Sequence, residues 1–496
     1  MATEATRLDD LAAVVGADLR PASSDADVSG VEFDSREVTP GDLFACVPGG
    51  SFDGHDYADA AVTAGAVAVL CERPLDVTVP QLVVASVREA IGPVARAVYG
   101  SPDDAMDIIG VTGTNGKTTT TIMVESVLAS ADRVPGLIGT IETRIAGVSR
   151  PVRHTTPEAP ELYELLADMA DSGIDTVVME VSSHALDQHR VGGLRFGVAA
   201  FTNLTQDHLD YHGDMESYFA AKAAMFMPDV ADRAVINVDD EYGCRLVETC
   251  RDNGIPVVTY TAEGAAADVG VTVTAETAAS LTLEISGMNG PESIVLGTGG
   301  TFNASNAACA AAIAVALGIA PRAVKAGLEG MRPVPGRFEP VVAGQSFGVV
   351  VDYAHTPDGV ENVLGAARSV VGKGRLIVVI GCGGDRDRAK RPLMGAAAAR
   401  LADRVIVTSD NPRSEDPLQI IDEIMPGVRA EGASAEIEPD RRKAIALAFA
   451  SAEAGDLVVI AGKGHETGQE IAGEIMPFDD RDVARSELSD HAEARL

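Results

Sequence analysis

The chain has 496 residues, and its 39 lysines and arginines against 74 aspartates and glutamates give a formal net charge of −35. So acidic a balance argues against nucleic acid or an anionic membrane as the main partner, because both need a basic face. The hydrophobic share of 46% argues against general disorder, and the length is typical of about three domains.

The first ten residues are acidic and carry no apolar run, so we expect no signal peptide. The longest apolar stretch, residues 307–320, is too short for a membrane span and predicts a buried helix. The six cysteines form no CxxC pair, which favours buried thiols in a reducing compartment. We therefore expect a cytoplasmic protein that binds no nucleic acid and spans no membrane. We also expect a monomer, although none of these features bears on the oligomeric state.

Residues 1–105 mix short apolar strands with turns rich in glycine and proline, which predicts an N-terminal α/β domain. From residue 106 to residue 331, apolar β-branched runs alternate with helix-like runs. Continuous runs of this kind predict a parallel sheet with helices on both faces. The expected strands of this block are residues 107–111, 176–181, 198–203, 234–238 and 256–260.

The alternation breaks at residues 332–336, where two prolines and a glycine predict a hinge. A second α/β unit follows, so we expect three domains: residues 1–105, 106–331 and 332–496. In open parallel sheets, ligands bind beyond the carboxyl ends of the strands, and the polar motifs of this chain follow such ends. The expected strands of the last block are residues 347–353, 375–381, 404–410 and 457–462.

The first motif, TGTNGKTT at residues 112–119, follows a predicted strand and leads into a helix-like segment. Glycines let backbone N–H groups converge on phosphate oxygens at a helix N-terminus. Lys117 is then expected on the β- and γ-phosphates of ATP, and the Thr118 hydroxyl on Mg²⁺. The generic pattern has glycine where this chain has Val111, so the alternative is a turn that only begins a helix. The expected ATP contacts here are Gly113, Thr114, Asn115, Gly116, Lys117, Thr118 and Thr119.

Residues 112–120 resemble the ATP loop of the Mur ligase family, the ATP-dependent amino-acid ligases of peptidoglycan precursor synthesis. The family's loop departs from the generic pattern in the way seen at Val111. Further matches span essentially the whole chain in the expected order. They are HTTPE (154–158), EVSSHALDQHR (180–190), NLTQDHLDYHG (203–213), YFAAKAAMF (218–226), GTFNASNAACA (300–310), PGRFE (335–339), DYAHTPDG (352–359), GGDRDRAKRP (383–392), DNPRSEDP (410–417) and GKGHE (462–466).

The resemblance implies a UDP-sugar-binding N-terminal domain, a central P-loop ATPase domain with a parallel sheet, and a Rossmann-like amino-acid-binding C-terminal domain. It implies an ATP-dependent ligase that joins meso-diaminopimelate to UDP-N-acetylmuramoyl-L-alanyl-D-glutamate through an acyl phosphate, releasing ADP and phosphate. The competing interpretations are a lysine-adding Mur ligase, a ligase similar to folylpolyglutamate synthase, and a P-loop ATPase or binding module that carries out no ligation. The N-terminal block and the DNPR tetrapeptide disfavour the synthase.

The resemblance also implies that the catalytic residues are Lys117, Glu180, His208 and Lys222. The implied metal ligands are Thr118, Glu180, His208 and Lys222. Lys222 would be carbamylated by CO₂, because a bare ammonium beside two Mg²⁺ ions would be repelled. The chain has only seven lysines, which makes a chance match at this position improbable. The alternatives are an ordinary surface lysine at 222 and a polar loop at His208. Zinc at His208 and His212 is disfavoured because a third nearby ligand is missing.

For the UDP-muramoyl-dipeptide, the resemblance implies contacts in the N-terminal and central blocks. Arg190 suits an anionic pair of oxygens. Thr155 and Thr156 have the alternative role of capping a helix before Pro157. The implied contacts are Ser35, Thr155, Thr156, Ser182, Gln188 and Arg190.

Further ATP contacts are implied at Asn303, Arg337 and Asp352, of which Asn303 could instead cap the following helix. Diaminopimelate is expected in the last block, where the fork-shaped guanidinium of Arg413 suits the carboxylate that lysine lacks. The alternative is an Asn-Pro turn with a surface salt bridge. The implied diaminopimelate contacts are Arg391, Asp410, Asn411, Pro412, Arg413, Gly462 and Glu466.

Overall fold

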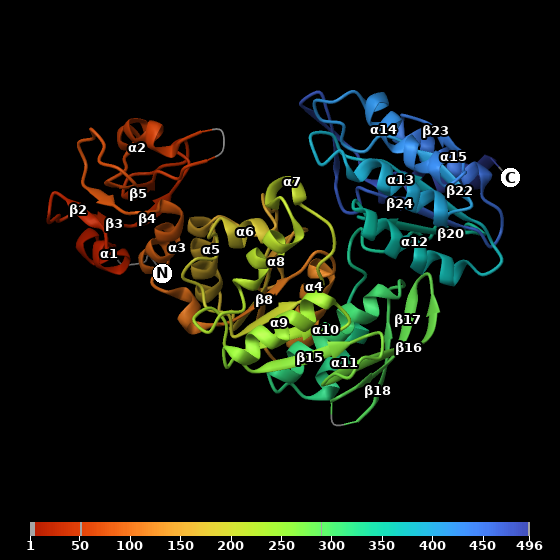
Figure 1. Cartoon of the computed structure of the whole chain (residues 1–496), viewed down its shortest axis with the longest axis horizontal. Helices are drawn as coiled ribbons and strands as arrows, with labels where there is room; N and C mark the ends of the chain where they lie inside the picture. Colours follow the sequence, from red (N-terminus) through yellow and green to blue (C-terminus); the bar gives the residue numbers. More distant parts are fainter. Residues whose placement is uncertain (1–4, 50–51, 289, 495–496) are drawn as a thin grey trace.

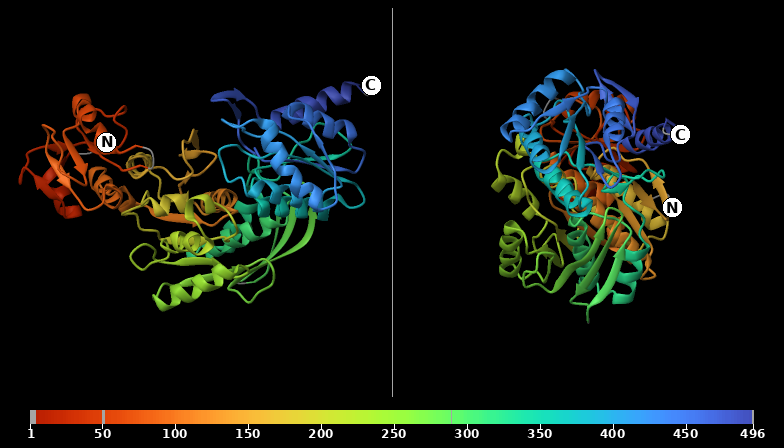
Figure 2. Two further views of the ribbon diagram at one scale, coloured as in Figure 1. Left: turned by 45° about the horizontal axis from the view of Figure 1, so that its top comes forward. Right: turned by 90° about the vertical axis from the view of Figure 1, so that its right-hand side faces the viewer.

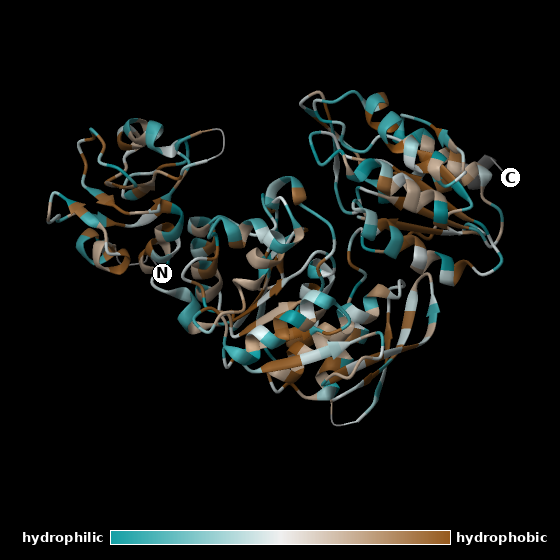
Figure 3. Cartoon of the chain, viewed as in Figure 1, coloured by the Kyte–Doolittle hydropathy of each residue, from teal (hydrophilic) through white to brown (hydrophobic). Residues whose placement is uncertain are grey.

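The computed structural model describes residues 5–49, 52–288 and 290–494. Figure 1 shows three α/β units in chain order, with the central unit between the other two. Their sheets have five, eleven and six strands. Figure 3 shows that the strands within the units are largely hydrophobic and that hydrophilic residues lie on the outer helices and loops.

The N-terminal sheet has the order β2-β7-β6-β5-β4, in which β4 to β7 are parallel and β2 is antiparallel. Helix α3 begins after Ser86, whose Oγ accepts a hydrogen bond from Glu89 N, and buries one apolar face. The elements are β1 (Thr6–Arg7), α1 (Leu8–Val15), β2 (Asp18–Arg20), β3 (Asp27–Val28), β4 (Gly30–Glu32), β5 (Asp42–Ala45), a 3₁₀ helix (Gly54–Tyr57), α2 (Ala58–Ala64), β6 (Ala68–Cys71), β7 (Gln81–Val83), α3 (Val87–Val98) and a second 3₁₀ helix (Pro102–Ala105).

The central sheet has the order β11-β10-β9-β12-β8-β13-β14-β15-β16-β17-β18, with parallel pairing from β9 to β16 and antiparallel hairpins at both edges. Its strands are β8 (Asp107–Thr112), β9 (Pro135–Ile138), β10 (Thr143–Ile145), β11 (Val148–Arg150), β12 (Thr176–Glu180), β13 (Val198–Phe201), β14 (Ala234–Asn237), β15 (Val257–Thr261), β16 (Val269–Thr277), β17 (Ser280–Ser286) and β18 (Glu292–Leu296).

Helices cover both faces of the central sheet. The predicted buried helix at residues 307–320 is confirmed as α10, which starts five residues earlier and packs against α4, β15 and β16. Its run of alanines permits this close packing because the side chains are small. The helices are α4 (Lys117–Ala129), α5 (Ala159–Asp171), α6 (Ser183–Asp187), α7 (Leu209–His212), α8 (Met215–Ala223), α9 (Glu241–Asp252), α10 (Phe302–Ala316) and α11 (Pro321–Gly330).

The N-terminal and central units pack closely on each other. A Cβ atom at Gly92 of α3 would lie 2.2 Å from the Gly192 carbonyl oxygen, so this approach requires glycine. One apolar cluster extends from α1 and α3 into β8, β12 and α5. The two units therefore share a continuous hydrophobic core.

The C-terminal sheet has the order β19-β20-β24-β21-β22-β23 and is parallel except for β19. Helices α12, α13 and α14 cover one face, and α15 and α16 cover the other. The elements are β19 (Glu339–Pro340), β20 (Gly348–Asp352), α12 (Pro357–Val371), β21 (Leu376–Ile380), α13 (Lys390–Leu401), β22 (Arg404–Val407), α14 (Pro417–Ala430), β23 (Ala435–Ile437), α15 (Arg441–Ser451), β24 (Leu457–Ala461), β25 (Gly468–Ile471), β26 (Glu474–Pro477) and α16 (Asp480–Ala494).

An irregular segment after α11 joins the central and C-terminal units, as Figure 2 shows from two further directions. Gly336 in this segment has a φ of 63°, and a Cβ atom there would lie 2.1 Å from the Gly464 carbonyl carbon. The segment therefore packs backbone to backbone against residues 462–466.

The predicted fold class is confirmed, and each predicted strand is present with shifts of one to three residues at its ends. The antiparallel edge strands of the central sheet were not predicted. Five cysteines are buried as expected, but Cys244 is exposed because it lies on the outer face of α9. Among the described residues, no helix is long and apolar enough to cross a membrane.

Candidate active site

The predicted phosphate loop lies where β8 ends and α4 begins. Gly113 and Gly116 have φ angles of 147° and 89°, which favour glycine. Lys117 Nζ donates hydrogen bonds to the carbonyl oxygens of Gly113 and Thr114, both at 2.9 Å. Burial lowers the pKa of Lys117, although nearby carboxylates oppose this effect. The side chain of Lys117 thus lies against the backbone of the predicted phosphate loop.

The segment after β13 supports this loop from the side. Thr202 Oγ1 donates to the Asn115 carbonyl oxygen at 2.6 Å, and Asn203 Oδ1 accepts from Asn115 N at 2.8 Å. Thr205 N donates to Thr114 Oγ1 at 3.0 Å. The neighbouring strand end therefore fixes the loop together with the loop's own glycines.

Glu180 ends β12, is almost completely buried and faces the start of α4. Its Oε2 accepts hydrogen bonds from Thr118 Oγ1 at 2.9 Å and from Thr140 Oγ1 at 3.1 Å. From the start of the C-terminal unit, just after the hinge, Arg337 Nη2 donates to the same Thr118 oxygen at 3.3 Å. The structure thus brings together Thr118, Glu180 and Arg337, which are far apart in the sequence.

Lys222 lies on α8 with only 1% of its surface exposed. Its Nζ donates to the Gly113 carbonyl oxygen at 2.9 Å and lies 4.7 Å from the centre of the Tyr218 ring. Burial lowers the pKa of Lys222 well below its ordinary value, and the charge of Lys117 lowers it further. The alternative of a surface lysine is therefore wrong.

His208 immediately precedes α7 and has a φ of 55°. Its Nε2 lies 3.3 Å from Asp207 Oδ2, and burial lowers the pKa of the imidazole despite this carboxylate. His212 Nε2 instead lies 3.0 Å from Ser183 Oγ. In the described parts of the chain, no three or more His, Cys, Asp or Glu side chains are grouped as ligands of one metal ion.

Thr155 and Thr156 lie next to Glu180. Thr156 Oγ1 donates to the Glu180 carbonyl oxygen at 2.9 Å, and Thr155 Oγ1 lies within hydrogen-bond distance of Thr140 Oγ1, at 3.1 Å. A capping box begins α5 at Glu158, so the alternative that the two threonines cap this helix is wrong. Their hydroxyls belong to the network around Glu180.

Ser182 and Arg190 complete this part of the site. Ser182 Oγ caps α6 by accepting from Ala185 N at 3.1 Å. Arg190 Nε lies 2.9 Å from Glu158 Oε1, and its Nη2 donates to Gln188 Oε1 at 2.8 Å. The guanidinium expected to bind an anionic substrate group is thus paired with a carboxylate of the protein.

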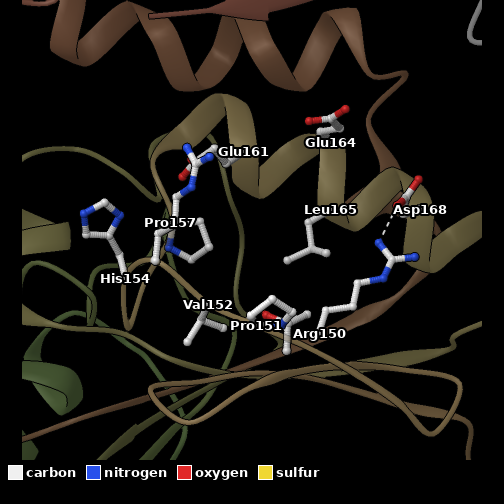
Figure 4. A pocket seen from close by; sticks show the side chains of 11 residues that line it. Arg150, Pro151, Val152, His154, Pro157, Glu161, Glu164, Leu165 and Asp168 are labelled. Atoms are coloured by element: carbon white, nitrogen blue, oxygen red, sulfur yellow. Dashed lines mark hydrogen bonds and ion pairs between the residues drawn. The ribbon is translucent and has the colours of Figure 1, made fainter. Parts of the chain in front are cut away.

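A cavity of about 360 Å³ lies beside these threonines, between residues 150–157 and α5. Figure 4 shows its lining, including the Arg150–Asp168 ion pair of 2.9 Å. Arg153 also lines the cavity and donates to Glu37 Oε1 at 3.1 Å. Because Glu37 lies two residues after Ser35, this ion pair connects the predicted UDP-sugar loop of the N-terminal unit with the central unit.

Asn303 lies inside α10, and both ends of its side-chain amide have partners. Its Nδ2 donates to the Gly299 carbonyl oxygen at 2.7 Å, and its Oδ1 accepts from Asn306 Nδ2 at 2.8 Å. The residue that precedes α10 is Thr301, so the alternative of Asn303 as the helix cap is wrong.

A line of contacts begins at Arg337, just after the hinge, and continues through the C-terminal unit. The Arg337 guanidinium lies 4.6 Å from the centre of the Tyr353 ring, which lies 5.1 Å from the His465 ring. Asp352 Oδ2 accepts from Phe338 N at 2.7 Å. Burial raises the pKa of Asp352 to about 6, although Arg337 acts in the opposite direction. The Thr118 contact of Arg337 extends this line to the phosphate loop.

The DNPR and GKGHE segments meet around the completely buried ammonium of Lys463. Its Nζ donates to Asn411 Oδ1 at 2.9 Å and to Glu466 Oε2 at 3.0 Å, and lies 3.8 Å from Asp410 Oδ1. Asn411 Nδ2 also donates to Glu466 Oε2 at 2.7 Å. A Cβ atom at Gly462 would lie 2.6 Å from Asp410 Oδ2. The structure thus brings four predicted diaminopimelate contacts together.

Arg413 has a φ of 53°, and its side chain is 22% exposed. Its Nη1 donates to the Gly384 carbonyl oxygen at 2.7 Å, and its Nε lies 3.4 Å from Glu470 Oε2. An ion pair of this kind agrees with a structural role as well. Among the described residues, the guanidinium has these two polar contacts and stays partly exposed.

Arg391 is more strongly engaged. Its completely buried guanidinium donates to both Glu415 oxygens, at 2.7 and 2.9 Å, and to Glu423 Oε2 at 2.7 Å. These bonds hold the segment that follows Arg413. The geometry therefore supports a role in placing the DNPR loop more directly than contact with an amino acid.

Comparisons with known proteins agree with this arrangement. The Mur ligase middle domain matches residues 111–314, the Mur ligase glutamate ligase domain residues 336–464, and the Mur ligase family catalytic domain residues 27–100. The UDP-N-acetylmuramoyl-L-alanyl-D-glutamate–2,6-diaminopimelate ligase of Geobacillus thermodenitrificans is 47% identical over 94% of this chain and 95% of its own length. The chain belongs to the Mur ligase family.

Other relatives of this Mur ligase extend the likeness. The ligase of the same name from Streptomyces avermitilis is 44% identical and covers 98% of this chain and 96% of its own. A solved structure described by that name is 34% identical, with a TM-score of 0.70, 98% of this chain and 99% of that chain covered. A folylpolyglutamate synthase structure from Mycobacterium tuberculosis has a TM-score of 0.59 at 22% identity, with 74% and 91% covered, and shows only a shared fold.

Thr140, Glu158 and Lys463 of this Mur ligase have no role predicted from the sequence. Lys463 stands inside the GKGHE motif in a chain with seven lysines, so its scarcity was a usable signal. Thr140 contacts Glu180 because it follows the strand next to that of Glu180, and Glu158 contacts Arg190 from the start of α5. No local sequence pattern reveals either contact.

Proposed function

We propose that this Mur ligase adds meso-diaminopimelate to UDP-N-acetylmuramoyl-L-alanyl-D-glutamate in peptidoglycan precursor synthesis, with ATP converted to ADP and phosphate. The observation that carries the proposal is the line of contacts from Thr118 through Arg337 and Tyr353 to His465, beside the Lys463 cluster. It joins the predicted ATP site to the predicted amino-acid site. The names of the relatives at 44–47% identity support the same substrates.

We assign one substrate to each domain: the UDP-sugar to residues 1–105, ATP to residues 106–331 and the amino acid to residues 332–496. The three family matches at residues 27–100, 111–314 and 336–464 support these boundaries. The packing of α3 on the central unit supports a fixed placement of the UDP-sugar beside the dipeptide contacts.

Mg²⁺ fits the residues near the phosphate loop. The ion prefers oxygen ligands, keeps several waters and needs few protein side chains. Thr118 and Glu180 offer such oxygens 2.9 Å from each other, and the resemblance adds His208 as a nitrogen ligand. When bound, the metal would neutralise charge on the transferred phosphoryl group.

Carbamylation of Lys222 also fits. Its neutral amine nitrogen would attack the carbon of CO₂, forming an N–C bond and releasing a proton. The product is an anion with oxygen donors in place of a buried cation. Complete burial and the neighbouring Lys117 both disfavour the ammonium form, which supports this modification.

The reaction begins when the D-glutamate side-chain carboxylate attacks the γ-phosphorus of ATP and ADP leaves. The amine of diaminopimelate then attacks the acyl phosphate, and phosphate leaves with formation of the amide. Lys117 and Arg337 would stabilise the phosphoryl charge. Arg337 Nε is buried and has no partner among the described residues, so it can donate a hydrogen bond to a phosphate oxygen.

Phosphate release from ATP tests the proposal. We expect release to require both UDP-N-acetylmuramoyl-L-alanyl-D-glutamate and meso-diaminopimelate. Equal release with lysine in place of diaminopimelate would indicate the lysine-adding ligase. Release with a folate and glutamate would indicate the synthase, and release with neither acceptor nor amino acid would indicate a plain ATPase.

A further inference from the structure

The C-terminal unit contacts the phosphate loop at a second point besides Arg337. Asp358 lies in the first turn of α12, and its Oδ2 accepts a hydrogen bond from Asn115 Nδ2 at 2.6 Å. The same oxygen accepts from Thr205 Oγ1 at 3.2 Å and from Asn362 Nδ2 at 3.0 Å. Two of the three donors belong to the central unit, so this carboxylate bridges the units.

Both donors of the central unit determine the shape of the loop. The backbone of Asn115 is held by Thr202 and Asn203, and the backbone N of Thr205 donates to Thr114 Oγ1. A displacement of α12 would therefore be transmitted through Asn115 and Thr205 to the residues that are predicted to surround the phosphates.

A carboxylate at residue 358 is electrostatically unfavourable beside a phosphate-binding loop. A carboxylate within hydrogen-bond distance of the phosphate loop opposes the binding of a triphosphate through like-charge repulsion. Burial also disfavours the charged form of Asp358 and raises its pKa. These two costs must be offset for a carboxylate to stand in this position. The three hydrogen bonds that it accepts offset them, and two of these bonds fix the conformation of the phosphate loop.

We propose that Asp358 is a positioning residue that couples docking of the C-terminal unit to the shape of the phosphate loop. Arg337 contacts Thr118 at the start of α4 and Asp358 contacts Asn115 in the middle of the loop, both from the same unit. The C-terminal unit is then docked on the central unit only when it contacts the loop at both Thr118 and Asn115. The proposal rests on the proposed ATP site. It names a residue through which the ATP-binding loop and the amino-acid-binding unit are coupled.

The test compares Asp358→Ala and Asp358→Asn in the full-length protein. Glu361→Ala is the matched control, because Glu361 lies three residues further along α12 and pairs with Arg400 of the same unit. Calorimetry with a non-hydrolysable ATP analogue gives the nucleotide affinity without any other substrate. Steady-state kinetics then gives kcat and the KM for each substrate.

We expect Asp358→Ala to lower kcat/KM for ATP by about 10- to 100-fold, as the loss of two hydrogen bonds of ordinary strength implies. The affinity for the ATP analogue should fall in the same variant, while the affinity for the UDP-sugar substrate should stay within about twofold. Asp358→Asn keeps an oxygen acceptor towards Asn115 and should recover most of the loss. Glu361→Ala should behave as the unmodified protein.

Unchanged nucleotide affinity and kcat in Asp358→Ala would overturn the proposal, and so would an equal loss in Glu361→Ala. If Asp358→Ala does not fold, Thr205→Val tests the proposal instead, because it removes one donor to the same oxygen. We then expect a rise of about three- to tenfold in the KM for ATP at an unchanged melting temperature. Because the calorimetric readout needs no ligase activity, failure of the proposed function is distinguishable from failure of this proposal.

Discussion

Replacing Asp480 by Asn breaks an ion pair beneath the predicted amino-acid site. Asp480 begins α16, and its two carboxylate oxygens accept from Arg441 Nε and Nη2, both at 2.7 Å. Both side chains are completely buried. Arg441 also donates to the carbonyl oxygens of Ser409 and Ala461, at 3.3 and 3.0 Å, which immediately precede two predicted diaminopimelate contacts.

The expected loss of stability is large because Arg441 stays buried without its counter-charge. Removing one partner of a buried pair costs about 3–5 kcal/mol. For a unit of this size, each kcal/mol lowers the melting temperature by about 2–4 °C, so the C-terminal unit should melt about 6–20 °C lower. The KM for diaminopimelate should rise more than the KM for ATP, since the guanidinium supports the amino-acid loops.

Differential scanning calorimetry of the full-length protein without substrates measures this change. Asp482→Asn is the matched control, because its carboxylate lies on the same helix, is 75% exposed and pairs with Arg485. Exposed pairs contribute about 0–1 kcal/mol, so the control should melt almost as the unmodified protein does. A decrease in Asp480→Asn no larger than in Asp482→Asn would refute the reasoning.

Three further changes test the site. Lys222→Ala should lower kcat at least about 100-fold, with partial recovery when a short-chain carboxylic acid is added, and full activity without the acid would contradict carbamylation. Arg413→Ala should raise the KM for diaminopimelate more than about tenfold at unchanged ATP affinity, as kinetics and calorimetry would reveal. Burial raises the pKa of Asp352 to about 6, so its contribution to stability is present at pH 4 and is lost as the pH rises through 6. Denaturant titrations should show that unmodified protein loses about 3 kcal/mol relative to Asp352→Asn between pH 4 and pH 7, and parallel pH profiles would contradict this.

The parallel strands were predictable because strands covered on both faces are apolar throughout. The edge strands were not, for a related physical reason. Strand β16, Val269–Thr277, has several exposed residues and alternates apolar with polar side chains, so it lacks a continuous apolar run. Strand β11, Val148–Arg150, is exposed along its whole length and leaves no such run either.

The candidate site divides in the same way. Residues whose chemistry is local, such as Lys117 in its loop or Glu180 at a strand end, could be named from motifs. Pairs that depend on how separate elements pack could not be named, because spacing along the chain carries no information about them. Arg391 with Glu415, Arg190 with Glu158 and Asp358 with Asn115 are such pairs.

The close contact between Gly336 and Gly464 restricts how the C-terminal unit can turn. Any side chain at residue 336 would collide with the backbone of the GKGHE segment, so the end of the connecting segment travels with the amino-acid site as one rigid piece. A rotation of the C-terminal unit would then have to occur before Gly336, within residues 331–335, where Pro333 and Pro335 limit the free torsions. Such a short and stiff pivot permits few orientations of the bound amino acid, so its amine meets the acyl phosphate along a narrow range of approach.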